Sequence, residues 1–213
     1  MSAVKVHLYD DSSLKHSIDV SSGSWSKSAV SLAAGDHILK ARAEDQAGNI
    51  SGYSSVKRIL TGSSAKPTVD LLTDTGQSSI DNVTNDDTFS LKAHLNIPVP
   101  AGASAVSSNS VSAIKLYKKT GTSTYDLAAT LSASLVDPAT GEWESEVWDE
   151  QGPADGTHEY CASWVDAQGN ESDKGSLLSV VLDTQAPDLP SIDNISDGQV
   201  FVGTAIDVSG SAT

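Results

Sequence analysis

The sequence predicts an all-β chain built of tandem immunoglobulin-like β-sandwich domains. Two observations support this: a segment near the N-terminus recurs about 120 residues later, and short runs of alternating apolar and polar residues are separated by turn residues. No stretch of the 213 residues shows sustained helical periodicity. About seven short strands per repeat are typical of two antiparallel sheets packed face to face.

The internal repeat is clearest around two Asp–Asn turns. Residues 39–51 resemble residues 160–172, an offset of 121, and His37 matches His158 at the same offset. Because the order of the matches is kept while the offset grows, we expect one fold with longer loops in its second copy. Two earlier matches complete the series: Val6–Tyr9 with Ile114–Tyr117 at 108, and Gly23–Trp25 with Gly141–Trp143 at 118.

Two polar linkers that end in proline divide the chain. We expect residues 1–66 to be the C-terminal part of a first repeat, residues 67–186 a complete repeat, and residues 187–213 the truncated start of a third. The chain is therefore interpreted as a segment of a longer array. Aligning the two linkers places Thr61 where the second linker has Asp183.

The elements of the complete repeat follow from alternation. Phe89, Leu91, Ala93 and Leu95 alternate with polar residues and predict an early strand. Residues 96–112, with two prolines, predict a long loop. Later strands are expected around Ile114–Leu116, Trp143, Tyr160–Trp164 and Val180–Leu182, separated by turns at residues 140–141, 152–156 and 168–170.

Charge and hydropathy each exclude one class of protein. The chain has 13 Lys and Arg against 28 Asp and Glu, a net charge of −15. Residues 1–66 carry eight basic and six acidic residues, a net of +2, whereas residues 67–213 carry five and 22, a net of −17. Such a surface repels phosphates, so we expect no nucleic-acid partner. No apolar run could span a bilayer and no N-terminal signal peptide is apparent, so we expect no membrane insertion.

The sequence offers no catalytic constellation, so we expect no enzyme. No Gly-x-Ser-x-Gly motif or phosphate-binding glycine loop occurs, and the five histidines never cluster at metal-ligand spacing. Cys161 is the single cysteine, and it alternates with apolar residues as a strand residue would. A secreted chain of this kind would have no disulfide, so something else must stiffen it.

Clusters of Asp and Asn in the predicted turns indicate Ca²⁺ as the cofactor. Asp, Asn and Gly also form tight turns by capping their own backbone, and acidic residues also keep a secreted chain in solution. However, carboxylates packed without basic partners repel one another unless a cation lies between them, and Ca²⁺ takes 6–8 oxygen ligands. The candidate ligands are Asp45, Asn49, Asp74, Asp81, Asp86, Asp166, Asn170 and Asp183.

Topology predicts how these ligands group. In an immunoglobulin-like sandwich the turn between the last two strands lies at the pole where the chain enters the domain. We therefore expect Asp166 and Asn170 to face the linker around Thr61–Lys66, and Asp74, Asp81 and Asp86 to lie near Asp183 at the opposite pole. A neutral Thr61 predicts weaker Ca²⁺ binding, or none, at the first junction.

Three motifs, Asp166–Asn170, Asp183–Pro187 and Asp74–Asp86, resemble the bacterial immunoglobulin-like repeats of giant non-fimbrial adhesins exported by type 1 secretion. The resemblance covers the whole chain. It departs from the family at Thr61 and at Phe89–Leu91, where many repeats carry proline. It implies a bacterial cell-surface filament of tandem domains, stiffened by Ca²⁺ at the junctions, that reaches a host surface as a virulence factor. A C-terminal secretion signal would lie outside this segment.

The resulting hypothesis is a Ca²⁺-stiffened spacer, monomeric as a fragment, whose partners are the neighbouring repeats and, through the parent protein, a host surface. One alternative is that the segment itself binds a surface glycan, through residues 96–112 or through exposed rings among Trp148, Tyr125 and Tyr53. A coplanar pair of exposed rings would favour the glycan. Another alternative is an accessory sandwich beside a secreted hydrolase.

Overall fold

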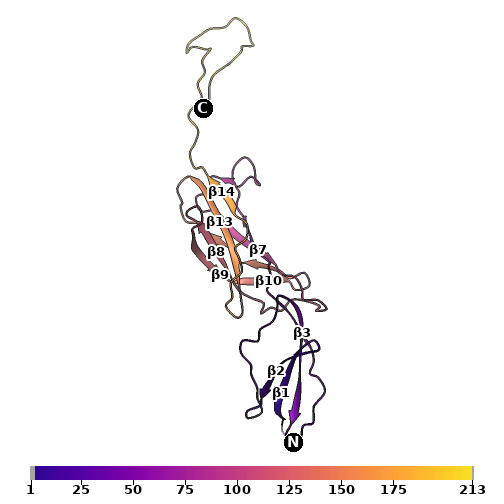
Figure 1. Cartoon of the computed structure of the whole chain (residues 1–213). Helices are drawn as coiled ribbons and strands as arrows, with labels where there is room; N and C mark the ends of the chain where they lie inside the picture. Colours follow the sequence, from indigo (N-terminus) through magenta and orange to yellow (C-terminus); the bar gives the residue numbers. More distant parts are fainter. Residues whose placement is uncertain (1–2, 213) are drawn as a thin grey trace.

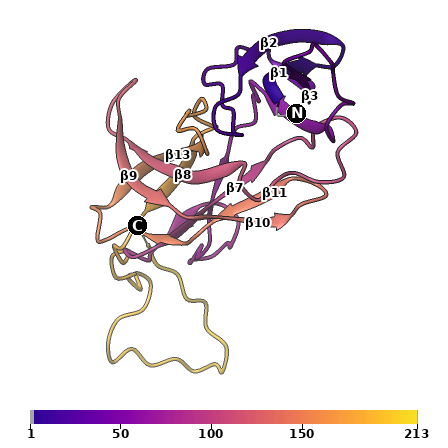
Figure 2. The same cartoon turned by 90° about the horizontal axis from the view of Figure 1, so that it is seen from below.

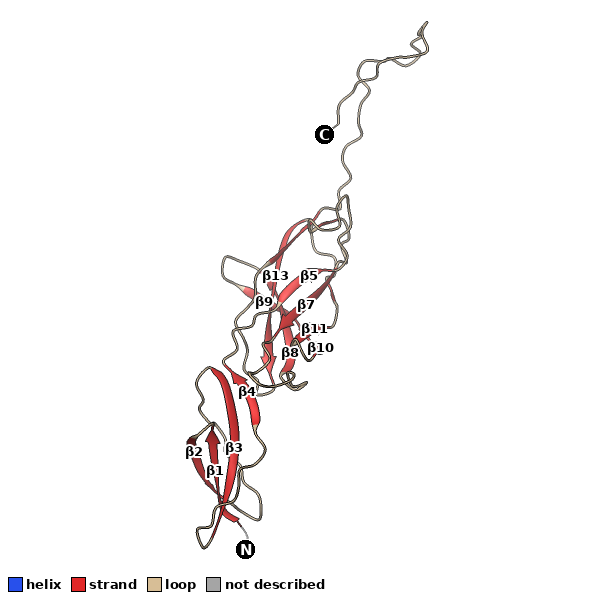
Figure 3. Cartoon of the chain, turned by 90° about the vertical axis from the view of Figure 1, so that its right-hand side faces the viewer, coloured by secondary structure: helices blue, strands red, loops and turns tan. Residues whose placement is uncertain are grey.

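The computed structural model describes residues 3–212, in which all regular structure is β. Figure 1 shows an elongated molecule with a first unit of strands at the N-terminal end, a larger second unit in the middle and a bare hairpin at the C-terminal end. Figure 3 shows the same end-to-end order from the side. The predicted all-β class is therefore confirmed.

The first unit is one antiparallel sheet with the order β2-β1-β3-β4. Val6 and Leu8 are buried because they alternate along β1 on the same face of this sheet. Residues 20–34 run beside it with only an isolated bridge between Ser21 and Ser24. The strands are β1 (Ala3–Asp10), β2 (Ser13–Asp19), β3 (Gly35–Asp45) and β4 (Lys57–Thr61).

The second unit is a sandwich of two five-stranded sheets. One sheet contains β5 (Thr68–Leu71), β7 (Ser90–Asn96), β10 (Ala133–Asp137), β11 (Glu142–Ser145) and β12 (Trp148–Asp149). The other contains β6 (Val83–Thr84), β8 (Val111–Lys119), β9 (Tyr125–Leu131), β13 (Gly156–Asp166) and β14 (Leu178–Leu182).

The pairing of these strands is that of an immunoglobulin-like domain. All pairs are antiparallel apart from β6 with β14, which is parallel. The chain thus begins in one sheet with β5, crosses over, and adds β6 to the edge of the other sheet beside β14. This crossing carries residues 74–86 over one pole of the sandwich.

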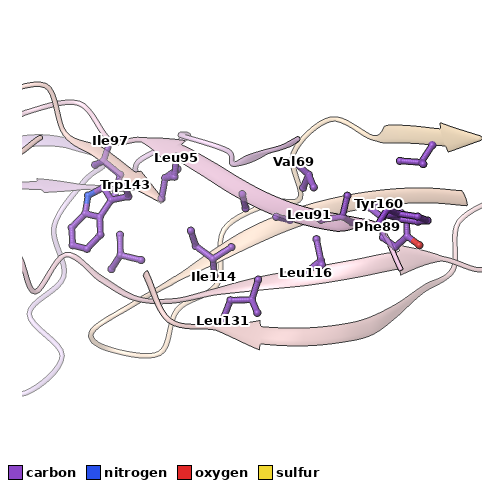
Figure 4. Close-up of a cluster of buried hydrophobic side chains, with 14 of the residues drawn as sticks. Val69, Phe89, Leu91, Leu95, Ile97, Ile114, Leu116, Leu131, Trp143 and Tyr160 are labelled. Atoms are coloured by element: carbon purple, nitrogen blue, oxygen red, sulfur yellow. The ribbon is translucent and has the colours of Figure 1, made fainter. Parts of the chain in front are cut away.

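The core of the second unit follows the predicted alternation. Along β7 the buried positions are Leu91, Ala93 and Leu95, and Figure 4 shows the strand's apolar side chains facing those of β8. Trp143 closes one end of this core and Tyr160 the other, and each is at most 1% exposed. The Tyr160 hydroxyl donates a hydrogen bond to Glu150, which also accepts one from Lys118 at 2.9 Å.

The two units share one pairing register. Val6 pairs with Ala43 in the first unit and Ile114 pairs with Trp164 in the second, which reproduces both offsets of the sequence repeat. Likewise, the Nε2 atom of His37 lies 2.8 Å from the Ala33 carbonyl oxygen, and that of His158 lies 2.8 Å from the Ala154 carbonyl oxygen. Residues of the two units can therefore be compared position by position.

The tryptophans matched between the units lie in different surroundings. Trp143 lies on β11, hydrogen-bonded to β7, and is 1% exposed. Its counterpart Trp25 lies outside any strand and is 43% exposed. Among residues 3–61 no strand takes the place of β7, so the segment around Trp25 has no strand to pair with.

The register corrects one detail of the linker alignment. Thr61 pairs with Gly35 as Leu182 pairs with Gly156, so Thr61 corresponds to Leu182. The residue that corresponds to Asp183 is therefore Gly62. The alignment of the two linkers from their sequences was therefore off by one position. Each linker follows consecutive apolar residues, and either of two such residues can be matched to the same strand position.

The C-terminal segment is a hairpin without a sandwich around it. Ser191 donates a backbone hydrogen bond to Ser211 and Asp193 donates one to Ser209, at 2.9 Å each. Apolar side chains such as Leu189 and Val200 are almost completely exposed to solvent. Figure 2, seen from below, shows this segment projecting away from the two units.

Candidate functional site

The two matched Asp–Asn turns are capped by their own backbone. The Oδ1 atom of Asp166 accepts hydrogen bonds from the backbone N–H groups of Gln168 at 2.8 Å and Asn170 at 2.9 Å, and Oδ2 accepts one from the Asn170 side chain at 2.9 Å. Asp45 is held in the same way by Asn49. Burial raises the pKa of Asp166, but the hydrogen bonds from Asn170 outweigh it and lower the pKa overall.

Asp45 responds similarly: hydrogen bonds from the side chain and backbone of Asn49 lower its pKa. The strong N–H donors around both carboxylates already balance their charge. These hydrogen bonds make both turns structural caps on the local backbone, and their binding of Ca²⁺ stays a prediction.

The linker to the second unit meets the loop after β13, although not at the predicted residues. A hollow between the linker and the second unit is lined by residues 62–66 on one side and by Glu171, Ser172 and Asp173 on the other. Lys66 pairs with Asp173 at 3.3 Å. Asp166 and Asn170 do not line this hollow.

Glu171 is the centre of a polar cluster beside that hollow. It accepts hydrogen bonds from Lys115 at 2.6 Å, Tyr117 at 2.5 Å and Ser163 at 2.6 Å. Burial raises the pKa of Glu171, but these hydrogen bonds lower it to about 2. The cluster ties β8, β13 and the following loop together.

At the opposite pole, the second unit brings three predicted segments together. Asp74 accepts the backbone N–H of Asn82 at 2.9 Å, and Asp183 donates its backbone N–H to Thr84 at 3.0 Å. The Thr75 and Thr84 hydroxyl oxygens are 2.6 Å apart. The segments around Asp74 and Thr84 therefore lie beside the backbone of Asp183, whereas the approach of the Asp74, Asp81 and Asp86 carboxylates to that of Asp183 stays a prediction. We call this region the C-terminal pole.

The carboxylates of the C-terminal pole differ in their hydrogen-bond partners. Asp81 accepts the N–H of Val83 at 3.1 Å, and Asp86 accepts the N–H of Thr88 at 2.9 Å, so each caps its own loop. Asp74 is different, because its Oδ1 atom is buried and has no hydrogen-bond partner. An unpartnered buried carboxylate oxygen is costly unless a cation or water meets it.

Asp155 belongs to the same pole and was not predicted. Its Oδ1 atom accepts hydrogen bonds from the backbone N–H of Thr184 at 3.0 Å and from the Thr184 hydroxyl at 2.8 Å. The hydrogen bond from the Thr184 hydroxyl is the main reason that the pKa of Asp155 is lowered. A comparison of the two repeats is the signal that points to it. Asp155 and Asp183 both stand where the first unit has a residue without a carboxylate, Ala34 and Gly62 respectively.

These observations test how the residues fit Ca²⁺. Within residues 3–212, no three His, Cys, Asp or Glu side chains are gathered closely enough to hold a metal ion as they stand. The C-terminal pole nevertheless fits an oxygen-ligated cation at one point, the free Oδ1 atom of Asp74. The carboxylates of the two Asp–Asn turns accept N–H donors, and so do the Oδ1 atoms of Asp155 and Asp183.

The geometry disfavours the glycan alternative. Tyr53 packs edge-on against Tyr9 at 5.4 Å, and Trp148 packs against buried Tyr160 at 6.1 Å. Tyr125 lies apart from both on β9. Among the described residues these three rings therefore form no coplanar exposed pair. The loop between β7 and β8, residues 97–110, contacts the first unit.

Cys161 is buried, and burial raises the pKa of its thiol, as expected for a structural strand position. No helix in the described part of the chain is long and apolar enough to cross a membrane.

No protein-family model and no curated protein match the chain. Solved structures do. The fibronectin(III)-like modules of Clostridium thermocellum CbhA align with 19% identity and a TM-score of 0.31, over 85% of this chain and 78% of that one. A tetra-tandem repeat in the extending region of a large adhesion protein aligns with 22% identity and a TM-score of 0.38, over 91% of this chain and 45% of that one.

Proposed function

We propose that this chain is a non-enzymatic spacer segment of a bacterial surface adhesin, secreted and displayed at the cell surface. Its role is mechanical: tandem immunoglobulin-like units hold an extended filament through which the parent protein reaches a host cell. The observation that carries the proposal is the linker between the units. Pro67 is buried and Ala65 accepts a hydrogen bond from Trp164 at 2.9 Å, so the linker is packed onto the second unit.

A linker packed in this way transmits orientation from one unit to the next. A free polar linker would behave as a flexible chain and let the units turn independently. Here Lys66 pairs with Asp173, and Gly175 lies so close to the Pro67 carbonyl oxygen that a side chain there would collide with it. The arrangement supports a stiff, end-to-end array.

At the C-terminal pole we propose that Ca²⁺ takes over this role. Asp74, Asp155 and Asp183 are the residues that would hold it, and the ion would supply the positive charge that links carboxylates from three segments. The hairpin of residues 187–212 has only the short stretch from Asp183 to Pro187 between it and the pole. Ca²⁺ binding would therefore restrict the start of the next unit, because an ion that binds the ordered arrangement more tightly favours it.

The charge distribution supports the same proposal. Residues 67–213 carry a net charge of −17, and no Lys or Arg occurs after Lys174. The C-terminal pole and the hairpin that follows it thus repel each other in the absence of a cation. Removing divalent ions should loosen this end of the molecule first.

The test is a calorimetric Ca²⁺ titration of the chelator-stripped chain. We expect saturable binding, which is lost in Asp155→Ala/Asp183→Ala and weakened in Asp74→Asn. The matched control is Asp45→Ala, in the capped turn of the first unit, which should leave the binding isotherm unchanged. Asp166→Ala tests whether the other predicted turn binds an ion as well. No heat of binding at millimolar Ca²⁺ would show that the acidic clusters only form turns.

A further inference from the structure

The first junction contains a contact that lies outside the linker. The tip of the 97–110 loop reaches the first unit, where the backbone N–H of Ala101 donates a hydrogen bond to Oδ1 of Asp36 at 2.8 Å. Gly102 lies against Arg58, since a Cβ atom at Gly102 would be only 2.7 Å from the Arg58 Nε atom. Asp36 lies on β3 and Arg58 on β4, so the loop touches both strands at one edge of the sheet.

The loop is held ready for this contact by the second unit. Ile97, at its start, and Val106, after its tip, are buried in the core. The N–H of Val106 donates to the Pro138 carbonyl at 2.9 Å, and the N–H of Ala103 closes a turn onto the Pro100 carbonyl at 2.9 Å. A loop ordered in advance loses little entropy when it makes a contact.

The shared register shows that this contact is specific to the first unit. Asp36 pairs with Leu60 as Thr157 pairs with Val181, so Thr157 takes the place of Asp36 in the second unit. By the same comparison, Ser179 takes the place of Arg58. The edge of the second unit therefore presents neither the acceptor nor the guanidinium that the loop meets.

The two poles therefore carry opposite sets of residues. The first unit has Ala34 and Gly62 where the second unit has Asp155 and Asp183. It has Asp36 and Arg58 where the second unit has Thr157 and Ser179, and we call these two loop-contacting residues of neighbouring strands the Asp36–Arg58 pair. The first junction is equipped for direct contact between units and lacks the two carboxylates of the C-terminal pole.

We propose that Ala101 and Gly102 form a clasp that recognises the Asp36–Arg58 pair of the preceding unit and fixes the first junction without a metal ion. The clasp defines the kind of neighbour the second unit accepts: a sheet edge with a carboxylate on its β3 strand and a guanidinium on its β4 strand. This inference goes beyond the calcium proposal and concerns the other end of the same unit.

The test is a distance measurement between spin labels on the full 213-residue chain in the presence of EGTA. Labels at Ser12 and Thr122, which are exposed in the turns after β1 and β8, report on the angle between the units. A Cys161→Ala background removes the native thiol. We expect one narrow distance distribution, which becomes at least twofold wider in Asp36→Thr/Arg58→Ser, the variant that gives the first unit the residues of the second.

Two controls separate recognition from general disruption. Thr157→Asp/Ser179→Arg makes the reverse exchange at the C-terminal pole and should leave the distribution unchanged. Asp36→Asn retains an oxygen that can accept the Ala101 N–H and should keep the distribution narrow. Unchanged near-ultraviolet circular dichroism shows that each variant folds.

Two outcomes would overturn the clasp. One is a distribution in Asp36→Thr/Arg58→Ser that matches the parent. The other is a broad parent distribution that becomes narrow only when Ca²⁺ is added, which would assign the first junction to a metal ion. Neither result depends on the titration of the C-terminal pole, so the two proposals fail separately.

Discussion

The indole Nε1 of Trp164 donates a hydrogen bond to the carbonyl oxygen of Ala65, 99 residues away in sequence, at 2.9 Å. Ala65 lies in the linker and Trp164 on β13, so this bond fixes the linker to the second unit. Ala65 is also partly buried against the second unit's core. The linker therefore folds as part of the second unit.

Replacing Trp164 with Phe removes this donor and keeps an aromatic ring. The Ala65 carbonyl then loses its partner, and the free energy of unfolding of the second unit should fall by about 1 kcal/mol. Urea unfolding measures the change. Trp25→Phe is the control, because this exposed ring should alter stability by less than about 0.5 kcal/mol. Equal effects of the two substitutions would mean that the bond contributes nothing.

The repeat in the sequence is enough to predict much of the fold. The offsets of 108 and 121 appear directly as strand pairing, because residues that share a register in one copy must share it in the other. The alternation around Leu91 correctly identifies the buried face of β7. Trp25 could not be placed in this way, because the burial of its counterpart Trp143 depends on pairing with a distant strand.

The site was less accessible to prediction. That the segments containing Asp74 and Asp183 come to one pole follows from topology, which fixes the ends of strands at that pole. At Asp166, the N–H donors of Asn170 and a cation would compete for the same carboxylate oxygens. The residue pattern alone does not tell which of the two binds there. The contact of Ala101 with Asp36 depends on the path of a 14-residue loop.

Acid and base should each destabilise the first unit through His37 and Asp10. His37 bonds the Ala33 carbonyl through Nε2 and Asp10 through Nδ1, both at 2.8 Å, and because both partners accept hydrogen bonds this geometry favours the doubly protonated imidazole. The bonds to Ala33 and then Asp10 raise the pKa of His37 above its ordinary 6.5. The bond from His37 lowers the pKa of Asp10 below its ordinary 3.8, helped by Lys15.

The direction of each pH effect follows from the linkage between proton binding and folding. The stabilisation from His37 is complete below pH 6.5 and is lost as the pH rises through its raised pKa. That from Asp10 is complete above pH 3.8 and is lost as the pH falls through its lowered pKa. Thermal unfolding of the first unit should therefore show highest stability between these values. His37→Gln should remove the loss of stability at alkaline pH. The control His158→Gln should retain it, because His158 lies in the second unit, where Lys118 is the residue equivalent to Asp10.

Glu171 should make the second unit sensitive to strong acid. Because its pKa is about 2 in the folded chain against an ordinary 4.5, its stabilisation is present above pH 4.5 and disappears as the pH falls toward 2. At neutral pH, Glu171→Gln should cost about 1–2 kcal/mol, a value discounted for its partial exposure to solvent. Glu142→Gln, exposed and outside the cluster, is the control. A variant as stable as the parent at pH 7 would show that Lys115, Tyr117 and Ser163 find other partners.

Leu8 and Leu116 occupy equivalent positions in the two units and should differ in their contribution to stability. Leu116 is 1% exposed between two sheets, so Leu116→Ala removes contacts on all sides and leaves a cavity, at a cost of about 3–4 kcal/mol. Leu8 is 9% exposed in a unit that has only one described sheet, and Leu8→Ala should cost about 1–2 kcal/mol, because a side chain enclosed by fewer neighbours leaves a smaller cavity. Urea unfolding followed by amide signals assigned to each unit measures both values in the same chain. A larger loss at Leu8 than at Leu116 would contradict the view that the second unit alone is a closed sandwich.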